Sequence, residues 1–247
     1  MHDLNGKKVL ITGGTTGIGM ASVLAFKAAG AEVMISGQNE ERLAEAGESA
    51  GVPTVHLDSG DMDSIAKLPA AVERDFGRID VLFLNAGATK LAPVDQTDEA
   101  TYDAMMDINA KGLFFTAQKL LPLINRGGAV ILNTSVNNQM GMAGSAAYAA
   151  SKAAVRSFTR VMAAEWIEHG IRVNAVSPGP IETPIYSKLG LPQETLEGFA
   201  QDISGKIPMK RFGKPEEIAN VVVFLASDQA SFVLGHELVA DGGWTEV

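Results

Sequence analysis

Residues 7–19 read Lys7-Lys-Val-Leu-Ile-Thr-Gly-Gly-Thr-Thr-Gly-Ile-Gly19, and this stretch decides the fold. The apolar run Val9–Ile11 predicts a buried strand, the glycines predict a tight loop, and the apolar periodicity that follows predicts a helix ending near Gly30. A strand, a glycine-rich loop and a helix form the context of a dinucleotide fingerprint, in which a pyrophosphate rests on the positive end of the helix. The spacing Gly-x-x-x-Gly-x-Gly fits the general fingerprint only loosely, so a purely structural turn is the alternative.

Further strand-like runs alternate with helical patterns along the rest of the chain. Strands that are apolar on both faces and alternate with helices predict an α/β fold with a doubly wound parallel sheet, Rossmann-like, in a single domain over residues 1–247. The expected strands are Val33–Ser36, Pro53–Leu57, Ile79–Leu84, Ala129–Asn133, Arg172–Val176 and Glu237–Val239, and the two longest expected helices are Met105–Leu123 and Ala146–Glu168.

Tyr148 and Lys152, in Tyr-Ala-Ala-Ser-Lys, follow Ser135 by thirteen and seventeen residues. Positions i and i+4 share one face of a helix, so the phenol and the ammonium are expected to point into the same space. A nearby cation favours the phenolate and lowers the tyrosine pKa toward the range of efficient acid/base catalysis. A neighbouring serine hydroxyl would then hold a carbonyl or alcohol oxygen. Taken alone, the pair is more typical of a half-buried ring beside a solvated charge.

Composition limits the function classes that need consideration. The 247 residues are 46% hydrophobic, contain no cysteine and carry a formal net charge of −9 without a run of Lys or Arg. Nucleic acid and anionic membranes are therefore not expected partners. Disulfides, thiolate catalysis and cysteine-based zinc sites are excluded, and the four histidines lack metal-ligand spacing, so no metal is expected. The absence of cysteine, of an apolar membrane span and of room for a signal peptide predicts a cytoplasmic protein.

Four segments together resemble the classical short-chain dehydrogenase/reductase family, in its order and spacing over essentially the whole chain. They are Thr12-Gly-Gly-Thr-Thr-Gly-Ile-Gly19, Asn85-Ala-Gly87, Ser135 with Tyr148-x-x-x-Lys152, and Ser177-Pro-Gly-Pro180 followed by Thr183.

The resemblance implies four catalytic residues. Tyr148 matches the general acid/base, Ser135 the hydroxyl that steadies the substrate oxygen, and Lys152 the residue that lowers the tyrosine pKa and bonds the nicotinamide ribose. Asn109 matches an asparagine that holds a water in a proton relay toward the lysine. An exposed position is the alternative for Asn109, because asparagine is disfavoured within helices.

The resemblance also implies where a nicotinamide cofactor binds. Asp58 matches the residue that accepts a hydrogen bond from the adenine amino group, although a helix cap is its alternative. Asn85-Ala-Gly87 matches a wall beside the adenosine ribose, with a simple turn as the alternative. The full predicted set is Gly13, Thr15, Thr16, Gly17, Ile18, Gly19, Gln38, Asn39, Asp58, Ser59, Asn85, Ala86, Gly87, Tyr148, Lys152, Pro178, Gly179, Ile181 and Thr183.

The family places a substrate lid at about residues 185–208, and usually assembles as homotetramers through the two long helices and the last strand with its tail. The candidate apolar pocket residues are Ile185, Tyr186, Leu189, Leu191 and Phe199 together with Val136, Met140 and Met142, all of which core packing would also explain. The pattern predicts a small carbonyl or alcohol substrate without identifying it.

The choice between NADP and NAD departs from both family patterns. Neither an acidic residue nor a Lys or Arg stands at the end of the second strand, where this chain has Ser36-Gly-Gln-Asn39, and Thr16 stands before the second glycine of the loop. Because excluding NADP requires a repulsive element, we predict that NADP is accepted and preferred, with NAD as the alternative. Arg42 is a candidate phosphate ligand from the next helix, opposed by Glu40 and Glu41 if they face inward.

Together these motifs predict an oxidoreductase that transfers a hydride between the cofactor and a ketone or secondary alcohol, acting as a carbonyl reductase. The rival hypothesis is an NAD(P)-binding scaffold or sensor without turnover. An epimerase or dehydratase on a related fold is disfavoured by the compact length.

Overall fold

The computed structural model describes residues 3–184 and 193–247 of the chain. Seven parallel strands form one sheet in the order β3-β2-β1-β4-β5-β6-β7. The strands are β1 (Lys8–Thr12), β2 (Glu32–Gly37), β3 (Thr54–His56), β4 (Ile79–Leu84), β5 (Ile124–Asn133), β6 (Arg172–Pro178) and β7 (Glu237–Ala240). The predicted doubly wound parallel sheet is confirmed.

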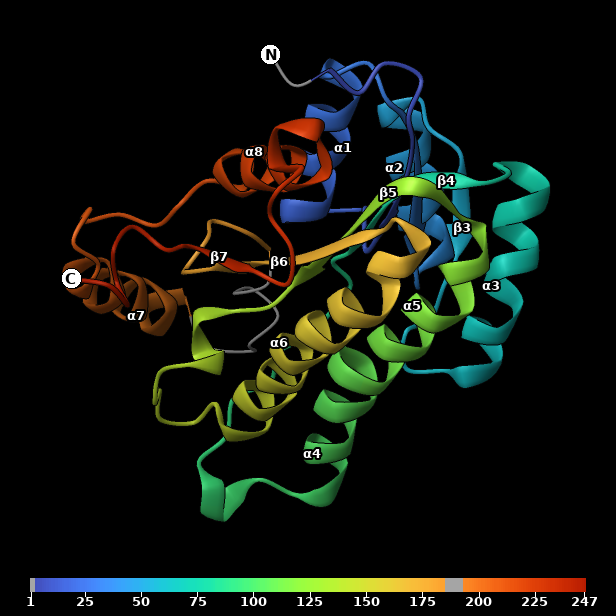
Figure 1. Cartoon of the computed structure of the whole chain (residues 1–247). Coiled ribbons are helices and arrows are strands. Elements are labelled where there is room, and N and C mark those ends of the chain that lie inside the picture. The colour runs from blue at the N-terminus through green and yellow to red at the C-terminus, as the bar shows by residue number, and fades with distance from the viewer. Residues whose placement is uncertain (1–2, 185–192) are drawn as a thin grey trace.

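Eight α-helices accompany the sheet in the described part of the chain. They are α1 (Gly17–Ala28), α2 (Glu40–Ala50), α3 (Met62–Asp75), α4 (Glu99–Met106), α5 (Leu113–Leu120), α6 (Ala146–Trp166), α7 (Gln193–Lys206) and α8 (Pro215–Ala226). Helices α1 and α8 pack on each other on one face of the sheet, and α3, α5 and α6 cover the other face (Figure 1). α7 lies apart from both layers, beside the carboxyl end of β7 (Figure 1).

The two layers follow from the alternation of side chains along buried strands. In β1, Val9 and Ile11 join the apolar cluster that includes Phe26 of α1, whereas Leu10 joins the opposite cluster, which includes Trp166 of α6. Because successive side chains point to opposite faces, a strand covered by helices on both sides must be apolar at every position. This is why the strands read as continuous apolar runs rather than as alternating patterns.

The sheet order places a crevice beside β1. The chain builds β1, β2 and β3 toward one edge and then returns to the other side of β1 with β4. The loops that leave β1 and β4 therefore diverge at the carboxyl edge, and ligands of such sheets bind at this switch point.

One expected helix has a different form in the structure. The pattern over Met105–Leu123 predicts a continuous helix, but the helical segment begins earlier, because the Asp98 side chain accepts a hydrogen bond from the Thr101 N–H at 2.8 Å and caps α4. A π-helical stretch, Asp107–Gly112, then separates α4 from α5. The last residue of this stretch, Gly112, packs directly on the backbone at Ser59. A Cβ at Gly112 would lie 1.8 Å from the Ser59 carbonyl oxygen, so this position has no room for a side chain.

Several predicted boundaries also shift. β5 begins five residues before the predicted Ala129, β3 is shorter than the predicted Pro53–Leu57, and α6 ends at Trp166 in a 3₁₀ turn closed by Gly170 in the left-handed region. Part of the predicted lid, residues 185–192, lies outside the described residues, and with it four of the expected pocket residues, Ile185, Tyr186, Leu189 and Leu191.

Candidate functional site

A cavity of about 480 Å³ lies along the carboxyl edge of the sheet. Its wall contains every predicted site residue except Gly19 and Asn109, which lie behind it. The predicted residues that reach the cavity are Gly13, Thr15, Thr16, Gly17, Ile18, Gln38, Asn39, Asp58, Ser59, Asn85, Ala86, Gly87, Ser135, Tyr148, Lys152, Pro178, Gly179, Ile181 and Thr183.

The glycine loop after β1 leaves room for a ligand at the start of α1. Gly13 and Gly17 have φ values of 64° and 53°, a region that side chains disfavour. A Cβ at Gly19 would lie 2.1 Å from the Gly13 carbonyl oxygen, so the loop closes tightly onto the first turn of the helix. Thr16, the N-cap, makes no side-chain cap bond, and no acidic residue occupies the first turn. The N–H groups in the first turn of α1 therefore have no side-chain cap, and the loop glycines have no Cβ. Both features fit a bound pyrophosphate.

A chain of partly buried hydrogen bonds links the glycine loop to Lys152. The Asn85 amide donates to the Thr12 and Gly13 carbonyl oxygens at 3.2 and 3.0 Å, and its Oδ1 accepts from Asn133 Nδ2 at 3.0 Å. The Asn133 carbonyl oxygen in turn accepts from Lys152 Nζ at 2.8 Å. Three strands therefore hold the loop and the ammonium in a fixed relation. Asn85 is more than a turn residue, because its side chain joins two strand ends.

Tyr148, Ser135 and Lys152 meet at one wall of the cavity. Ser135 follows β5, and the other two share a face of α6, as the i and i+4 spacing predicts. Burial raises the pKa of Tyr148, and a hydrogen bond with Ser135 opposes this rise. Burial lowers the pKa of Lys152 to about 8, and its Nζ lies 5.8 Å from the centre of the Tyr148 ring.

The pKa of Tyr148 is raised, which is opposite to the lowering expected from the nearby lysine alone. Removal of the phenol from water disfavours the phenolate more than its surroundings favour it. Tyr148 is therefore a neutral proton donor at neutral pH, and Lys152 remains mostly charged there because its pKa of about 8 is still above 7.

Asn109 lies within the π-helical stretch and is fully buried, so the alternative of an exposed asparagine is wrong. Its Oδ1 accepts from the Ala88 N–H at 2.8 Å, and its Nδ2 donates to the Ala88 carbonyl oxygen at 2.9 Å and to Ser151 Oγ at 3.1 Å. The side chain thus fastens the loop after β4 to α6. Its two amide hydrogens already have acceptors, which leaves one Oδ1 lone pair for the predicted relay water.

The far end of the cavity is lined by the ends of β2 and β3. Asp58 accepts from Gly60 N at 2.8 Å and from Gln38 Nε2 at 2.9 Å. The helix-cap alternative for Asp58 is wrong, because Asp61 caps α3 by accepting from Asp63 N. Asp58 is therefore held at the cavity wall, where a carboxylate can accept a hydrogen bond from an amino group.

The other polar groups at this end of the cavity differ in how far they are free to bind a ligand. Asn39 caps α2, and its Oδ1 accepts from Arg42 N at 2.9 Å, so only its amide hydrogens remain free for a ligand. Arg42 itself lines the cavity, and Ser36 Oγ is buried there without a hydrogen-bond partner.

The opposite end lies after β6. Ile181 pairs with Gly213 in an isolated bridge, and a Cβ at Gly17 would lie 3.0 Å from Thr183 Cγ2. A Cβ at Gly179 would lie 2.7 Å from Asp241 Cα, so the chain after β6 packs directly on the turn after β7. This packing brings Ile181 and Thr183, two of the predicted cofactor-binding residues, next to the glycine loop.

Several cavity residues were not identified from the sequence. They are Thr89, Leu91, Asn133, Asn137, Ile203 and Trp244. The signal for Trp244 is the preceding Asp241-Gly-Gly243, in which Asp241 accepts from Gly243 N, Thr245 N and Thr245 Oγ1, each at 2.8 Å. This turn bends the C-terminal tail back toward the cavity.

Two negative observations hold for the residues that the structure describes. None of the helices there is both long and apolar enough to cross a membrane. Within the same residues, no group of three or more His, Cys, Asp or Glu side chains is placed to hold a metal ion.

Comparison with known proteins gives consistent matches over nearly the whole chain. A family model described as enoyl-(acyl carrier protein) reductase matches residues 13–245. The chain is 41% identical to 3-oxoacyl-(acyl-carrier-protein) reductase FabG of Thermotoga maritima over 249 residues, covering 97% of this chain and 98% of that protein. It is 35% identical to gluconate 5-dehydrogenase of Gluconobacter oxydans over 252 residues, covering 99% and 97%.

The solved structure of a short-chain dehydrogenase/reductase described as a glucose/ribitol dehydrogenase, from Brucella melitensis, superposes with a TM-score of 0.92 at 32% identity and covers 100% of both chains. The sheet order, the glycine loop and the Ser–Tyr–Lys wall agree with these matches. The chain therefore belongs to the short-chain dehydrogenase/reductase family, whose members are oxidoreductases that act on alcohol and ketone groups.

Proposed function

We propose that this protein is a carbonyl reductase that converts a ketone into a secondary alcohol with a nicotinamide cofactor. The observation that carries the proposal is the wall where Ser135 and Tyr148 meet beside Lys152, at the same cavity as the glycine loop. The cavity joins a pyrophosphate-binding geometry to a proton donor.

A bound reduced nicotinamide would supply the hydride. The Tyr148 hydroxyl donates its proton to the substrate carbonyl oxygen, while Ser135 donates a hydrogen bond to the same oxygen. The ammonium of Lys152 then stabilises the phenolate that remains. The raised pKa of Tyr148 keeps the residue protonated before the step, which favours its use as an acid in the direction of reduction.

Substitution of Tyr148 by phenylalanine tests the proposal. The ring packing is retained and the proton donor is lost, so kcat should fall by the roughly 10²–10⁴-fold typical of general acid removal. Cofactor affinity, measured by quenching of protein fluorescence, should change little. Retention of more than about a tenth of the wild-type kcat contradicts the assignment, and a wild-type protein that binds cofactor but turns over no ketone or alcohol in a broad panel would instead be a scaffold or sensor.

We further propose that NADP is accepted and preferred over NAD. β2 ends in Gly37 rather than in an acidic residue, and Arg42 lines the cavity near that point. Gln38 contributes less than expected, because its amide already donates to Asp58. The cation at Arg42 is therefore the main attraction for a 2′-phosphate.

The ratio of kcat/KM for NADPH and NADH, measured with one substrate, tests this preference. Arg42→Ala should lower kcat/KM for NADPH by about tenfold and leave that for NADH nearly unchanged. Arg74→Ala on α3 is the matched control, since Arg74 is exposed and paired with Asp75. A tenfold or greater wild-type advantage for NADH overturns the proposal.

The remaining proposals concern the segment over the cavity, the assembly and the compartment. We propose that residues 185–208 act as the substrate lid, supported by Ile203 of α7, which lines the cavity. The lack of cysteine supports a cytoplasmic location.

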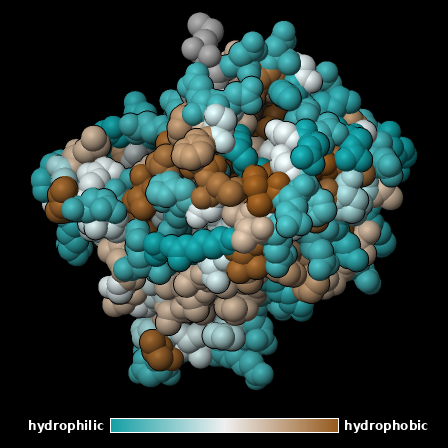
Figure 2. All heavy atoms as spheres, in the orientation of Figure 1, coloured by the Kyte–Doolittle hydropathy of each residue, from teal (hydrophilic) through white to brown (hydrophobic). Residues whose placement is uncertain are grey.

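We propose a homotetramer in which β7 and α6 contribute to the interfaces. β7 is an edge strand whose four residues are all partly exposed, and Phe232 just before it is fully exposed. Figure 2 shows apolar side chains gathered around β7 on this face of the molecule. An unpaired, apolar edge favours association with another copy. Light scattering should give four times the chain mass of 25.9 kDa, and a monomer at micromolar concentration contradicts the proposal.

A further inference from the structure

The turn that follows the catalytic serine carries an asparagine without an assigned role. Val136–Asn138 forms a 3₁₀ turn capped by Ser135, and Asn137 at its centre lines the cavity. Asn137 is only 8% exposed, yet its side-chain amide has no hydrogen-bond partner among the described residues. The amide atoms are also not sealed in the interior. The amide therefore opens to the cavity.

The first half of this turn is anchored to the sheet. The Ser135 Oγ accepts the Asn137 N–H at 3.3 Å, and Thr134 Oγ1 donates to the Val176 carbonyl oxygen of β6 at 2.9 Å. Val136 is 2% exposed. With its oxygen accepting the Asn137 N–H, the Ser135 hydroxyl directs its hydrogen toward Tyr148 or toward a ligand oxygen in the cavity.

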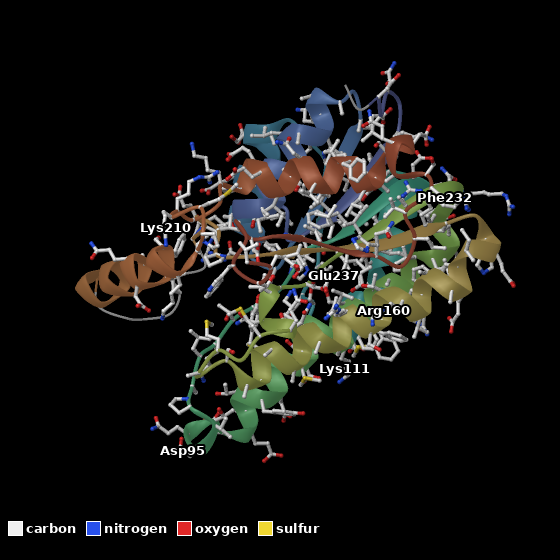
Figure 3. All side chains as sticks on the ribbon, turned by 60° about the vertical axis from the view of Figure 1, so that its left-hand side comes forward. Asp95, Lys111, Arg160, Lys210, Phe232 and Glu237 are labelled. Atoms are coloured by element: carbon white, nitrogen blue, oxygen red, sulfur yellow. The ribbon has the colours of Figure 1, made fainter. Side chains whose placement is uncertain are left out.

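The second half is anchored by an acidic residue of β7. Asn138 Nδ2 donates to Glu237 Oε1 at 2.5 Å, and Glu237 Oε2 lies 2.9 Å from Arg156 Nε in an ion pair that lacks hydrogen-bond geometry. The Glu237 side chain is 6% exposed, and Figure 3 shows it between β7 and α6. These contacts hold the backbone of Asn137 in place on both sides. The backbone position from which its side chain projects is therefore fixed.

An unpaired amide in such a place requires a partner when water is displaced. The wall of the same cavity includes the apolar side chains of Leu91, Val136 and Met142, which supply no hydrogen bond. A polar group left without a partner after a ligand closes the cavity is destabilising, whereas a ligand oxygen in reach of the amide removes that penalty. The site is therefore selective for ligands that carry such an oxygen.

We propose that Asn137 is a specificity-determining residue that donates a hydrogen bond to a second oxygen of the substrate. The substrate class is a ketone that carries a neighbouring oxygen group, such as a second carbonyl, an ester or a hydroxyl. This inference rests on the proposed carbonyl reductase function. Ser135 and Tyr148 hold the reacting oxygen, and Asn137 stands two residues beyond Ser135 in the same turn, so the second oxygen is close to the reacting carbon in the molecule.

Matched pairs of ketones test this inference. Ethyl acetoacetate is compared with 2-hexanone, and 1,2-cyclohexanedione with cyclohexanone, in kcat/KM with wild type, Asn137→Leu and Asn137→Ser. Asn137→Leu keeps the size of the side chain and removes its donor. The wild type should favour the oxygen-bearing member of each pair, and Asn137→Leu should reduce that ratio by about 10–100-fold, with Asn137→Ser intermediate.

The control is Asn220→Leu, an exposed asparagine on α8, which should leave the ratio unchanged. Thermal unfolding and cofactor affinity of each variant show whether the fold and the cofactor site are intact. If Asn137→Leu does not fold, the test is the kcat/KM ratio of the two ketones in each pair, compared between Asn137→Ser and the wild type. A wild type that reduces both members of each pair equally, or a variant with an unchanged ratio, overturns the inference and leaves the reductase proposal standing. Absence of turnover with every ketone overturns both.

Discussion

Two regions of the cavity, the glycine loop as its backbone-built end and the substrate wall as its side-chain-built end, come from different parts of the chain. The glycine loop is made of backbone from one continuous stretch, in which Gly13 and Gly17 adopt positive φ and Gly19 packs against the Gly13 carbonyl oxygen. The substrate end is made of side chains from separate elements, with Asn137 from the turn after β5, Ile203 from α7 and Trp244 from the C-terminal tail. A region built of local backbone tolerates almost no change at its glycines, whereas a region built of converging side chains can change its ligand while the fold is kept.

The largest expected effect is at the backbone-built end. Gly19→Ala places a Cβ 2.1 Å from the Gly13 carbonyl oxygen and 2.9 Å from Asn85 Nδ2, so the loop must move. We expect cofactor affinity to fall by more than about 100-fold and the free energy of unfolding to decrease by about 1–3 kcal/mol, as for overpacked sites. Cofactor titration and urea unfolding measure the two effects.

A second glycine provides the control for this comparison. Gly198 lies within α7, its φ is not positive, and a Cβ there would meet nothing within 4 Å. Gly198→Ala should therefore stabilise the protein by about 0.5–1 kcal/mol through the higher helix propensity of alanine. Retention of cofactor affinity within about threefold in Gly19→Ala would contradict the claim that this end depends on backbone contact.

This contrast also explains what the sequence could predict. The fold and the glycine loop were predictable because apolar runs and glycine spacing are local signals, and the i, i+4 spacing placed Tyr148 and Lys152 on one face. Asn109 was recognised as special, but its contacts with Ala88 and Ser151 were not, because those residues are 21 and 42 positions away. The π-helical stretch around it also interrupts the regular period from which helices are predicted.

The substrate end was less predictable for the same reason. Asn137 belongs to no periodic pattern, and its role depends on Glu237, which is 99 positions from the Asn138 it holds. The direction of the Tyr148 pKa also needed the structure, since burial outweighs the favourable effect expected from a nearby charge. Burial is a property of the assembled layers and cannot be obtained from spacing.

The next effect concerns Lys152, which stands where the two ends meet. Its folded pKa of about 8 lies below its ordinary value of 10.5, so its buried charge destabilises the fold below pH 8, where folded and unfolded chains are both protonated. Between pH 8 and 10.5 the unfolded chain binds more protons, and stability therefore rises with pH. Relative to Lys152→Met, the wild-type free energy of unfolding should rise by about 2 kcal/mol between pH 7.5 and 9.5.

Urea unfolding of both proteins at the two pH values measures this difference, and the subtraction removes groups common to both. Tyr148 does not disturb the comparison, because its raised pKa affects stability only above about pH 10, where the unfolded chain loses that proton first. Cofactor affinity of the wild type should weaken over the same interval as the ammonium is lost. A pH-independent difference between wild type and variant would mean that Lys152 is not desolvated.

The smallest expected effect is at the side-chain-built end. Trp244 lines the cavity and is held there by the turn at Asp241, whose carboxylate accepts from Gly243 N and Thr245 N. Trp244→Ala should remove one apolar wall and raise KM for a bulky ketone by about 2–10-fold, the magnitude expected for an aromatic contact, with kcat and cofactor affinity nearly unchanged. Steady-state kinetics with 2-hexanone and a larger aryl ketone measure the change, and Tyr102→Ala, an exposed aromatic position on α4, serves as the control. A loss of cofactor affinity comparable to that of Gly19→Ala would show that the tail supports both ends, and the proposed division of the cavity into a backbone-built and a side-chain-built end would then be wrong.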